Sequence, residues 1–402
     1  MTSSISKLFS PFKLGPITLR NRSIRSAAFE GICPGNLPSE DLLNYHHSVA
    51  AGGIGMTTVA YAAVDRSALS FPHQLLLDEK AVAGLRKITD AVHHEGAACS
   101  IQIGHCGNMA KRSVAGSRPI APSARLNLYG PTFPRRMNDT DIQDVVKDFG
   151  KAVHLATEAG FDAVEVHAGH GYLISQFLSP YTNKRRDSFG GTLGNRARLM
   201  LMVMDEVKKT AGNNLAVLVK INMRDGFRGG METKECIETA KMLEESGADA
   251  LVLSGGFVSK APMYVMHGAM PLKVFAHYIK NPLMKCFVGL AGKFLVKEVP
   301  FSEAYFLDDA MLFRSNLKIP LVYVGGLLSL EKINEALDRG FELVAFARAL
   351  IKDPDFINKL RDNEITRSEC DAGNYCIAVM YSGRASCILN EKNPDPRILK
   401  ML

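Results

Sequence analysis

The stretch DTDIQDVVKDFGKAVHLATEAGFDAVEVH, from Asp139 to His167, contains the pattern that decides the fold. Its first part predicts a helix, because apolar residues recur three and four positions apart and so share one face. These residues are Ile142, Val145, Val146, Phe149, Ala152, Val153 and Ala156. A short apolar strand then follows Gly160 and ends at His167. A helix that leads into a buried strand is the repeating unit of parallel α/β folds.

The same alternation extends in both directions along the chain. The segments with the composition of buried strands are residues 23–28, 54–62, 97–105, 161–167, 215–222, 249–255, 319–326 and 341–348. Most are followed by an amphipathic helical pattern, and Ser39 and Thr233 are expected helix caps. Eight such units predict an α/β fold of the (β/α)8 TIM-barrel class rather than an open sheet. Residues 12–21, turning at Gly15 and Pro16, predict an N-terminal β-hairpin that caps the barrel.

One connection is much longer than the others. Residues 256–318 separate the sixth and seventh strands and carry more basic than acidic residues. A connection of this length is usually a lid, a binding insertion or an interface, although it can also be a pair of solvated helices without a role in binding. We therefore expect residues 1–362 to form the barrel with this insertion. Residues 363–402 are expected to form a C-terminal extension packed on the barrel.

Composition limits the function classes. The 402 residues carry a net charge of +7, but the basic residues are scattered, which argues against nucleic acid and favours a small anionic ligand or cofactor. The eight cysteines lack the spacing of a disulfide scaffold, which predicts a reducing compartment. We find no secretory signal and no stretch of apolar residues long enough to cross a membrane. The expectation is a cytoplasmic protein, with homo-oligomerisation left open.

In a barrel of this class the active site lies at the carboxyl ends of the strands. Gln102, His167 and Lys220 stand at such ends and should face one cavity. After the last two strands, Gly325–Gly326 and Arg348 predict a phosphate site, because glycines admit close backbone approach and arginine forks onto phosphate oxygens. The helix expected to start near Ser329 would add its positive end.

The segment HAGHGY after the fourth strand has three interpretations. His167 and His170 can donate to one substrate oxygen while Tyr172 supplies a proton nearby. They can instead be metal ligands, for which only His105 and Cys106 offer a further ligand from the neighbouring strand. They can also be ordinary core histidines.

The longer segment HAGHGYLISQFLSPYTNKRRDSFGGTLGNRARL resembles the signature of the Old Yellow Enzyme family, the FMN-dependent ene-reductases. LFSPFKLGPITLRNR, GGIGMTTVA, IQIGHCGNM and VYVGGLLSLEKINEAL with FARALIKDP resemble other parts of the same family, so the resemblance covers most of the chain. It implies a barrel with FMN at its mouth. It also implies NADH or NADPH as the reductant and an α,β-unsaturated small molecule as the acceptor.

The resemblance also implies a role for each matching residue. His167 and His170 would grip the acceptor oxygen and Tyr172 would be the proton donor. Gln102 would hold the pyrimidine edge of the flavin, and Lys220 would lie near its N1 and O2. The remaining FMN contacts would come from Ala27, Ala28, Phe29, Ala60, Gly325, Gly326, Ala347 and Arg348.

Two departures from the family pattern bear on function. Phe29 stands where relatives carry threonine or cysteine, which leaves the acceptor range open. The tail from Cys370 to Asn390 resembles the iron–sulfur segment of 2,4-dienoyl-CoA reductases, but Gly373 replaces one cysteine. Only Cys370, Cys376 and Cys387 fit, so we predict no iron–sulfur cluster. The alternatives are a flavin barrel with other chemistry, such as amine dehydrogenation or demethylation, or a non-catalytic flavin-binding protein.

Overall fold

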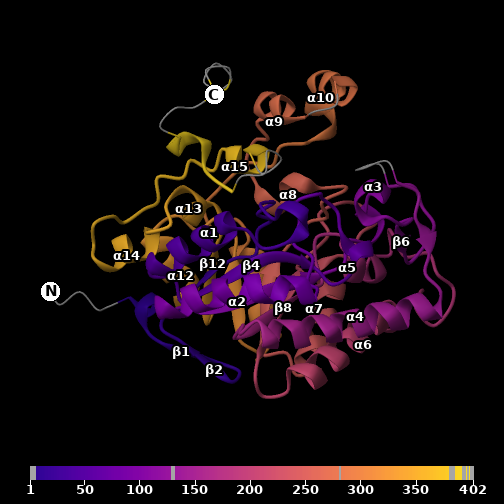
Figure 1. Ribbon diagram of the computed structural model, residues 1–402, viewed down its shortest axis with the longest axis horizontal. Helices are drawn as coiled ribbons and strands as arrows, with labels where there is room; N and C mark the ends of the chain where they lie inside the picture. The colour runs from indigo at the N-terminus through magenta and orange to yellow at the C-terminus, as the bar shows by residue number, and fades with distance from the viewer. Residues whose placement is uncertain are drawn as a thin grey trace.

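The computed structural model describes residues 6–127, 132–279, 282–379, 385–391, 395 and 398. Its centre is a closed barrel of parallel strands surrounded by helices (Figure 1). Around the barrel the strands keep their chain order: β3 (Ser23–Arg25), β4 (Met56–Ala63), β5 (Ala98–Gly104), β8 (Ala163–His167), β9 (Ala216–Asn222), β10 (Ala250–Ser254), β11 (Leu321–Val324) and β12 (Leu343–Phe346). β12 pairs with β3 and closes the ring, which confirms the predicted (β/α)8 barrel.

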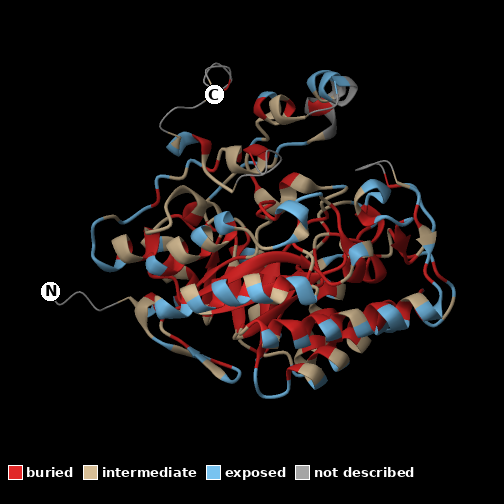
Figure 2. Cartoon of the chain, in the orientation of Figure 1, coloured by how far each residue is buried: buried red, intermediate tan, exposed pale blue. Residues whose placement is uncertain are grey.

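Helices cover the outside of the barrel with their buried faces turned inward (Figure 2), and the buried residues of these faces are mostly apolar. The outer helices are α1 (Glu40–Ala51), α2 (Glu79–His94), α4 (Asp139–Glu158), α6 (Leu193–Ala211), α7 (Thr233–Glu245), α11 (Leu307–Arg314), α12 (Leu330–Asp338), α13 (Arg348–Lys352) and α14 (Phe356–Arg361). In α4 every residue of the predicted apolar stripe is buried. The Ser39 side chain caps α1 as predicted, but Thr233 is the first helical residue of α7 rather than its cap.

The N-terminal hairpin closes one end of the barrel. Its strands β1 (Phe12–Leu14) and β2 (Ile17–Leu19) pair antiparallel, as predicted. Leu14 and Leu19 are fully buried and belong to the same core cluster as the side chains that fill the barrel interior. The hairpin therefore excludes water from this end and leaves the carboxyl ends of the strands as the open mouth.

Three connections build the mouth of the barrel. After β5 the chain forms α3 (Arg112–Ala115) and the small sheet of β6 (Ile120–Ala121) with β7 (Arg135–Arg136). After β8 it forms α5 (Leu173–Leu178). The predicted insertion contains α8 (Pro262–Met266), α9 (Leu272–Tyr278) and α10 (Pro282–Leu295), whereas α11 contacts α7 and β11 and completes the ring of barrel helices.

The insertion and the C-terminal tail share a small core of their own. α15 (Tyr375–Val379) contacts α9, and Val274, Ala378 and Val379 are buried together (Figure 1). Of the expected insertion and extension, residues 280–281, 380–384 and most of 392–402 lie outside the described part of the chain.

A membrane-crossing segment was not expected from the sequence. Among the described helices, none combines the length and the apolar composition that crossing a bilayer requires.

Candidate active site

A cavity of about 1730 Å³ opens at the carboxyl ends of the barrel strands. It exceeds the roughly 300–1,000 Å³ of a typical ligand pocket, so a cofactor and a second ligand can share it. Most of the residues predicted for the site line this cavity: Ala27, Ala28, Phe29, Gln102, His167, His170, Tyr172, Lys220, Gly326, Ala347 and Arg348. The rule that barrel sites form at strand ends therefore identified residues that lie at or just after six different strands and line one cavity.

Ala60 and Gly325 are placed differently from the other predicted residues. The Ala60 N–H donates to both carboxylate oxygens of the buried Glu30, over 3.2 and 3.0 Å. The Gly325 carbonyl accepts the Tyr323 hydroxyl over 3.1 Å. Glu30 therefore uses the Ala60 N–H, and contact between Ala60 and FMN stays a prediction.

His170 owes its position to a strained turn after β8. His170 and Gly171 both have left-handed backbone angles, with φ of 57° and 78°. A side chain at Gly171 would lie 2.5 Å from the Phe257 ring, so only glycine fits there. The Asn222 side chain accepts the His170 N–H over 2.9 Å, and Val258 N–H donates to the His170 carbonyl over 3.0 Å. These contacts hold a non-glycine residue in a backbone conformation that it rarely adopts.

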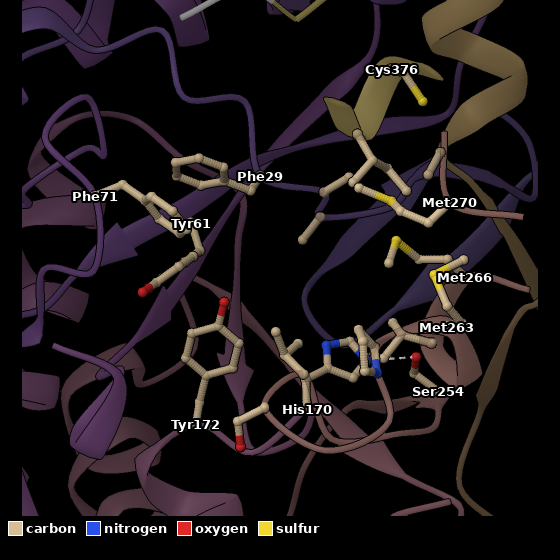
Figure 3. A pocket seen from close by; sticks show the side chains of 18 of the residues that line it. Phe29, Tyr61, Phe71, His170, Tyr172, Ser254, Met263, Met266, Met270 and Cys376 are labelled. Atoms are coloured by element: carbon tan, nitrogen blue, oxygen red, sulfur yellow. Dashed lines mark hydrogen bonds between the residues drawn. The ribbon is translucent and has the colours of Figure 1, made fainter. Parts of the chain in front are cut away.

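The two imidazoles and the phenol form one cluster, of which Figure 3 labels His170 and Tyr172. The His167 ring centroid lies 5.1 Å from that of His170 and 4.4 Å from that of Tyr172. Nε2 of His170 lies 2.8 Å from the Ser254 hydroxyl, and the Gly169 N–H donates to Nδ1 of His167 over 3.4 Å. The bond from Gly169 favours the tautomer of His167 that carries its proton on Nε2.

Both imidazoles are neutral in this environment. Burial, reinforced by His170 and Lys220, places the pKa of His167 well below its ordinary value. Burial and the Lys220 charge lower the pKa of His170 to about 3. A neutral imidazole donates one N–H and carries no charge, so the pair can bind an oxygen on which negative charge develops.

An aromatic wall stands beside this cluster (Figure 3). The Tyr61 ring centroid lies 5.0 Å from that of Tyr172, and the Phe29 ring packs 4.9 Å from Phe71. Burial raises the pKa of Tyr61, whose hydroxyl lies 2.9 Å from that of Ser70. Phe29, the departure from the family pattern, therefore belongs to an apolar surface that faces the cavity.

A buried ion pair lies at the floor of the cavity. Lys220 Nζ lies 2.9 Å from the Glu165 carboxylate, and both side chains are almost fully buried. Gln102 Nε2 donates to the same carboxylate oxygen over 2.6 Å, because Gln102 and Glu165 are direct neighbours on β5 and β8. The sequence analysis missed Glu165, although an acid in an apolar strand two positions before His167 is a signal for it.

Gly326 and Arg348 line another part of the cavity. Gly326 has φ of 70°, and a side chain there would lie 2.7 Å from the Tyr305 ring. Nη1 of Arg348 donates to the carbonyls of His267 and Ala372 and to Asn374 Oδ1, over 3.1, 3.2 and 2.7 Å. One guanidinium thus joins the insertion, the tail and the cavity wall.

Two backbone donors at the start of α12 are already engaged by a carboxylate. Leu328 N–H donates to the Glu303 carboxylate over 2.8 Å, and Ser329 N–H donates to the same oxygen. A carboxylate from the insertion therefore uses these two donors, and the contribution of this helix end to phosphate binding stays a prediction.

A metal site is not supported by the arrangement of the histidines. His105 turns toward the Ser67 hydroxyl, 3.2 Å away, and its Nδ1 accepts the Gly107 N–H. Burial lowers the pKa of His105 to about 4. Within the described part of the chain, no three histidine, cysteine or acidic side chains are grouped so that they could hold a metal ion.

The residues present fit a flavin mononucleotide. Lys220 and Gln102 offer a cation and an amide on one part of the wall. An anion site lies on another part of the wall, at Gly326 and Arg348. Gly326 leaves no room for a side chain. Apolar residues such as Ala345 and Phe346 line the same cavity. An amide, a cation, apolar walls and a phosphate cradle are the groups that a flavin nucleotide requires.

Proteins similar to this chain include flavin-dependent oxidoreductases. The model of the NADH:flavin oxidoreductase / NADH oxidase family matches residues 7–278. The 4,4'-dithiodibutanoate disulfide reductase of Rhodococcus erythropolis is 40% identical over 395 residues, which are 97% of this chain and 96% of that protein. The NADPH dehydrogenase of Listeria monocytogenes serotype 4b is 35% identical over 266 residues, covering 64% of this chain and 76% of that protein.

Solved structures with lower sequence identity share the fold. A 2-naphthoyl-CoA reductase in complex with 2-naphthoyl-CoA superposes with a TM-score of 0.80 at 24% identity, over 98% of this chain and 58% of that chain. The old yellow enzyme homologue of Zymomonas mobilis superposes with a TM-score of 0.72 at 24% identity, over 91% and 96%.

Proposed function

This chain belongs to the NADH:flavin oxidoreductase / NADH oxidase family, the Old Yellow Enzyme family, and on that basis we propose that it is an FMN-dependent ene-reductase. It takes a hydride from NADH or NADPH and transfers it to the activated C=C bond of an α,β-unsaturated acceptor. The observation that supports this reaction is the cluster of two neutral imidazoles and a phenol in one cavity with the flavin-binding groups.

The FMN site is proposed from the cavity wall. Gln102 and Lys220 would hold the ring system and the backbone and side chains of Ala27, Ala28 and Phe29 would pack beside it. The phosphate would lie at Gly326 and Arg348, with Gly325 and Ala347 shaping the chain around it. When bound, FMN supplies reversible storage of a hydride between the nicotinamide and the acceptor.

The histidine pair would act on the acceptor oxygen. As hydride adds to the β-carbon, the two C=C electrons move toward the carbonyl oxygen, which becomes negative. N–H groups of His167 and His170 stabilise that oxygen more strongly than the neutral carbonyl, and this difference accelerates the step. When Ser254 donates to Nε2 of His170, the ring proton lies on Nδ1 and can be donated to the acceptor.

Tyr172 would complete the reduction. Its hydroxyl transfers a proton to the α-carbon, so the acceptor gains one hydride and one proton in total. Bulk water returns the proton to the phenolate through the open cavity mouth. Neutral imidazoles leave Tyr172 as the only acid of the cluster, which fits the depressed pKa values of His167 and His170.

A visible spectrum and product analysis test this proposal. The purified protein is expected to show the absorbance bands of oxidised flavin, to bleach with NADH or NADPH without air, and to regain its colour when cyclohex-2-enone is added. Cyclohexanone should form in the same amount as the nicotinamide consumed. A colourless protein that takes up no added FMN contradicts the proposal, as does turnover with secondary amines but none with enones.

We also propose that the chain holds no iron–sulfur cluster. Cys370, Cys376 and Cys387 are the cysteines of the described tail, and none of them forms a disulfide. Three cysteines are fewer than the four that such clusters require. Iron and acid-labile sulfide assays on protein purified without oxygen test this directly, and stoichiometric iron overturns the proposal.

A second candidate is the reduction of an organic disulfide. Its support is the relative named as a 4,4'-dithiodibutanoate disulfide reductase, which aligns along nearly the whole chain. A hydride and a proton convert one disulfide into two thiols, so the same reductant and the same acid would serve. The kcat/KM values for 4,4'-dithiodibutanoate and cyclohex-2-enone, measured on one preparation, separate the two candidates.

A further inference from the structure

The charge on the cavity wall is of one sign. Among the described residues that line the cavity are six basic side chains and no aspartate or glutamate: Lys111, Arg112, Arg118, Lys220, Lys260 and Arg348. Like charges that face one hollow raise its potential, and low-dielectric walls concentrate the field there. The cavity is therefore built to hold negative charge.

Two of these cations already have partners within the protein. Lys220 is paired with Glu165, and Arg348 is bonded to three oxygens at the end proposed for the FMN phosphate. FMN and its phosphate therefore account for Lys220 and Arg348 but not for the other four.

The remaining four lie on two connections at the mouth, after β5 and after β10. Lys111 Nζ lies 5.4 Å from the Phe71 ring centroid, and Lys260 Nζ lies 4.9 Å from that of Tyr181. Arg118 donates to the Phe133 carbonyl over 2.9 Å. In the part of the chain that the structure describes, none of the four forms an ion pair with a carboxylate. Among the described residues, no carboxylate therefore neutralises these four charges.

Lys111 is the member of this group that also borders a smaller crevice together with Tyr172. Phe71 and Val258 border the same crevice. Phe71 also packs against Phe29, so the ammonium group stands at the end of the aromatic wall. A ligand whose reacting carbon lies next to Tyr172 therefore has Lys111 beside it, and Arg112 lines the same large cavity.

We propose that Lys111 and Arg112, with Arg118 and Lys260 at the rim, bind a carboxylate of the acceptor. The enzyme is thus specific for anionic acceptors, in which one end reacts at the His167–His170–Tyr172 cluster and the other end carries the carboxylate. This inference rests on the proposed function of the cavity and adds the substrate class to it. The same cations suit the phosphate oxygens of NADH or NADPH, which the experiment separates from the acceptor.

The test compares an acid with its ester. The acceptors are 4-oxopent-2-enoate and its methyl ester, which share the reacting enone. Because the ester also activates the C=C bond more strongly than the carboxylate does, each variant is compared with the original enzyme on the same acceptor. The variant is Lys111→Met combined with Arg112→Met. The control is Lys87→Met combined with Lys147→Met, which removes the same charge from exposed positions on α2 and α4. Stopped-flow measurements on flavin-loaded protein follow reduction by the nicotinamide and reoxidation by the acceptor separately.

For the carboxylate acceptor we expect the Lys111/Arg112 variant to have an apparent Kd in the reoxidation step higher by about tenfold or more, since bonds to charged groups have this strength. The methyl ester, the nicotinamide step and the control variant should change by less than about twofold. Equal losses for acid and ester overturn the proposal. A loss confined to the nicotinamide step also overturns it and assigns the cations to the phosphates of NADH or NADPH.

A binding measurement tests the proposed carboxylate site independently of the proposed reaction. The saturated compounds 4-oxopentanoate and methyl 4-oxopentanoate cannot accept a hydride at a C=C bond, so calorimetric titration reports affinity alone. Tighter binding of the acid, lost in the Lys111/Arg112 variant, supports the carboxylate site even if no enone is reduced. Equal affinity of acid and ester overturns the site even if enones are reduced efficiently.

Discussion

The Arg25 guanidinium and the Glu30 carboxylate lie 2.6 Å apart, and only 1% and 2% of their side chains are exposed. Glu30 also accepts the Ala60 N–H, and Arg25 donates to the carbonyls of Thr58 and Ala28. The pair therefore ties β3 and β4 to residues 26–29, the segment that faces the cavity. A buried charge without its partner is costly, so this pair controls the shape of the site as well as its stability.

Glu30→Ala is expected to lower the free energy of unfolding by about 3–5 kcal/mol, because it leaves the Arg25 charge buried and unpaired. Urea denaturation monitored by circular dichroism measures the change. Glu238→Ala, which removes the partner of Lys241 from an exposed pair on α7, should cost less than about 1 kcal/mol. Similar losses in both variants would show that Arg25 does not depend on Glu30.

Tyr172→Phe is expected to slow reoxidation by an enone by about 10²-fold or more, the usual contribution of a positioned general acid. Reduction by NADH or NADPH needs no proton from Tyr172 and should keep its rate. Stopped-flow absorbance of the flavin gives both rates on the same sample. If both half-reactions slow to the same extent, Tyr172 supports the cavity wall and is not the acid.

Glu165 and Lys220 are expected to act as a unit. Lys220→Met alone leaves the Glu165 charge buried and should destabilise the protein by about 3–5 kcal/mol. Lys220→Met combined with Glu165→Gln removes both charges and should recover most of that stability. The double variant still lacks the cation, so its flavin is expected to have a lower reduction potential. A potential equal to that of the original protein would place Lys220 away from the flavin.

Gly326→Ala is expected to weaken FMN binding strongly, because the added carbon would lie within 2.7 Å of Tyr305 at a position with positive φ. Equilibrium dialysis of the apoprotein against FMN measures the affinity. Gly194→Ala, at a position in α6 where the added carbon meets no atom within 4 Å, is the matched control. An unchanged affinity of the Gly326 variant for FMN would show that the phosphate binds elsewhere.

The depressed pKa of His170 predicts a pH dependence of stability. Its pKa is about 3 in the folded protein and about 6.5 in the unfolded chain, so the unfolded state binds the extra proton between these values. The contribution of His170 to stability is therefore complete above about pH 6.5 and is lost as the pH falls toward 3.

Unfolding free energies measured from pH 7 to pH 4 test this dependence. His170→Asn should reduce the slope by up to one proton, which is about 1.4 kcal/mol per pH unit. A slope that is the same in both proteins would mean that folding does not lower the pKa of His170. The reoxidation rate, in turn, should show no titration of the imidazole pair between pH 5 and pH 8.

The sequence was sufficient for the barrel and for much of the site, because both follow from local patterns. The apolar stripe of α4 and the strand that ends at His167 are one copy of a helix–strand unit. Eight copies of this unit along the chain favour a closed parallel barrel, which is the fold observed. Gln102 and Lys220 were found by the rule that strand ends face one mouth. No contact between them had to be known in advance.

The contacts that the sequence did not reveal are those between distant segments. Glu303 occupies the donors of Leu328 and Ser329, and Glu30 occupies that of Ala60, although each carboxylate lies 25 or more residues away. Asn222 and Ser254 orient His170 from two other strands. Such pairings depend on strand register and loop path, which periodicity does not specify.

Arg348 also constrains the order in which the cavity is assembled. It draws one acceptor from the insertion, at His267, and two from the tail, at Ala372 and Asn374. During synthesis the barrel strands and the insertion emerge before this part of the tail does. The guanidinium therefore reaches its final set of partners only after residue 374 has left the ribosome, so tight retention of the nucleotide is expected to be a late event in the maturation of this protein.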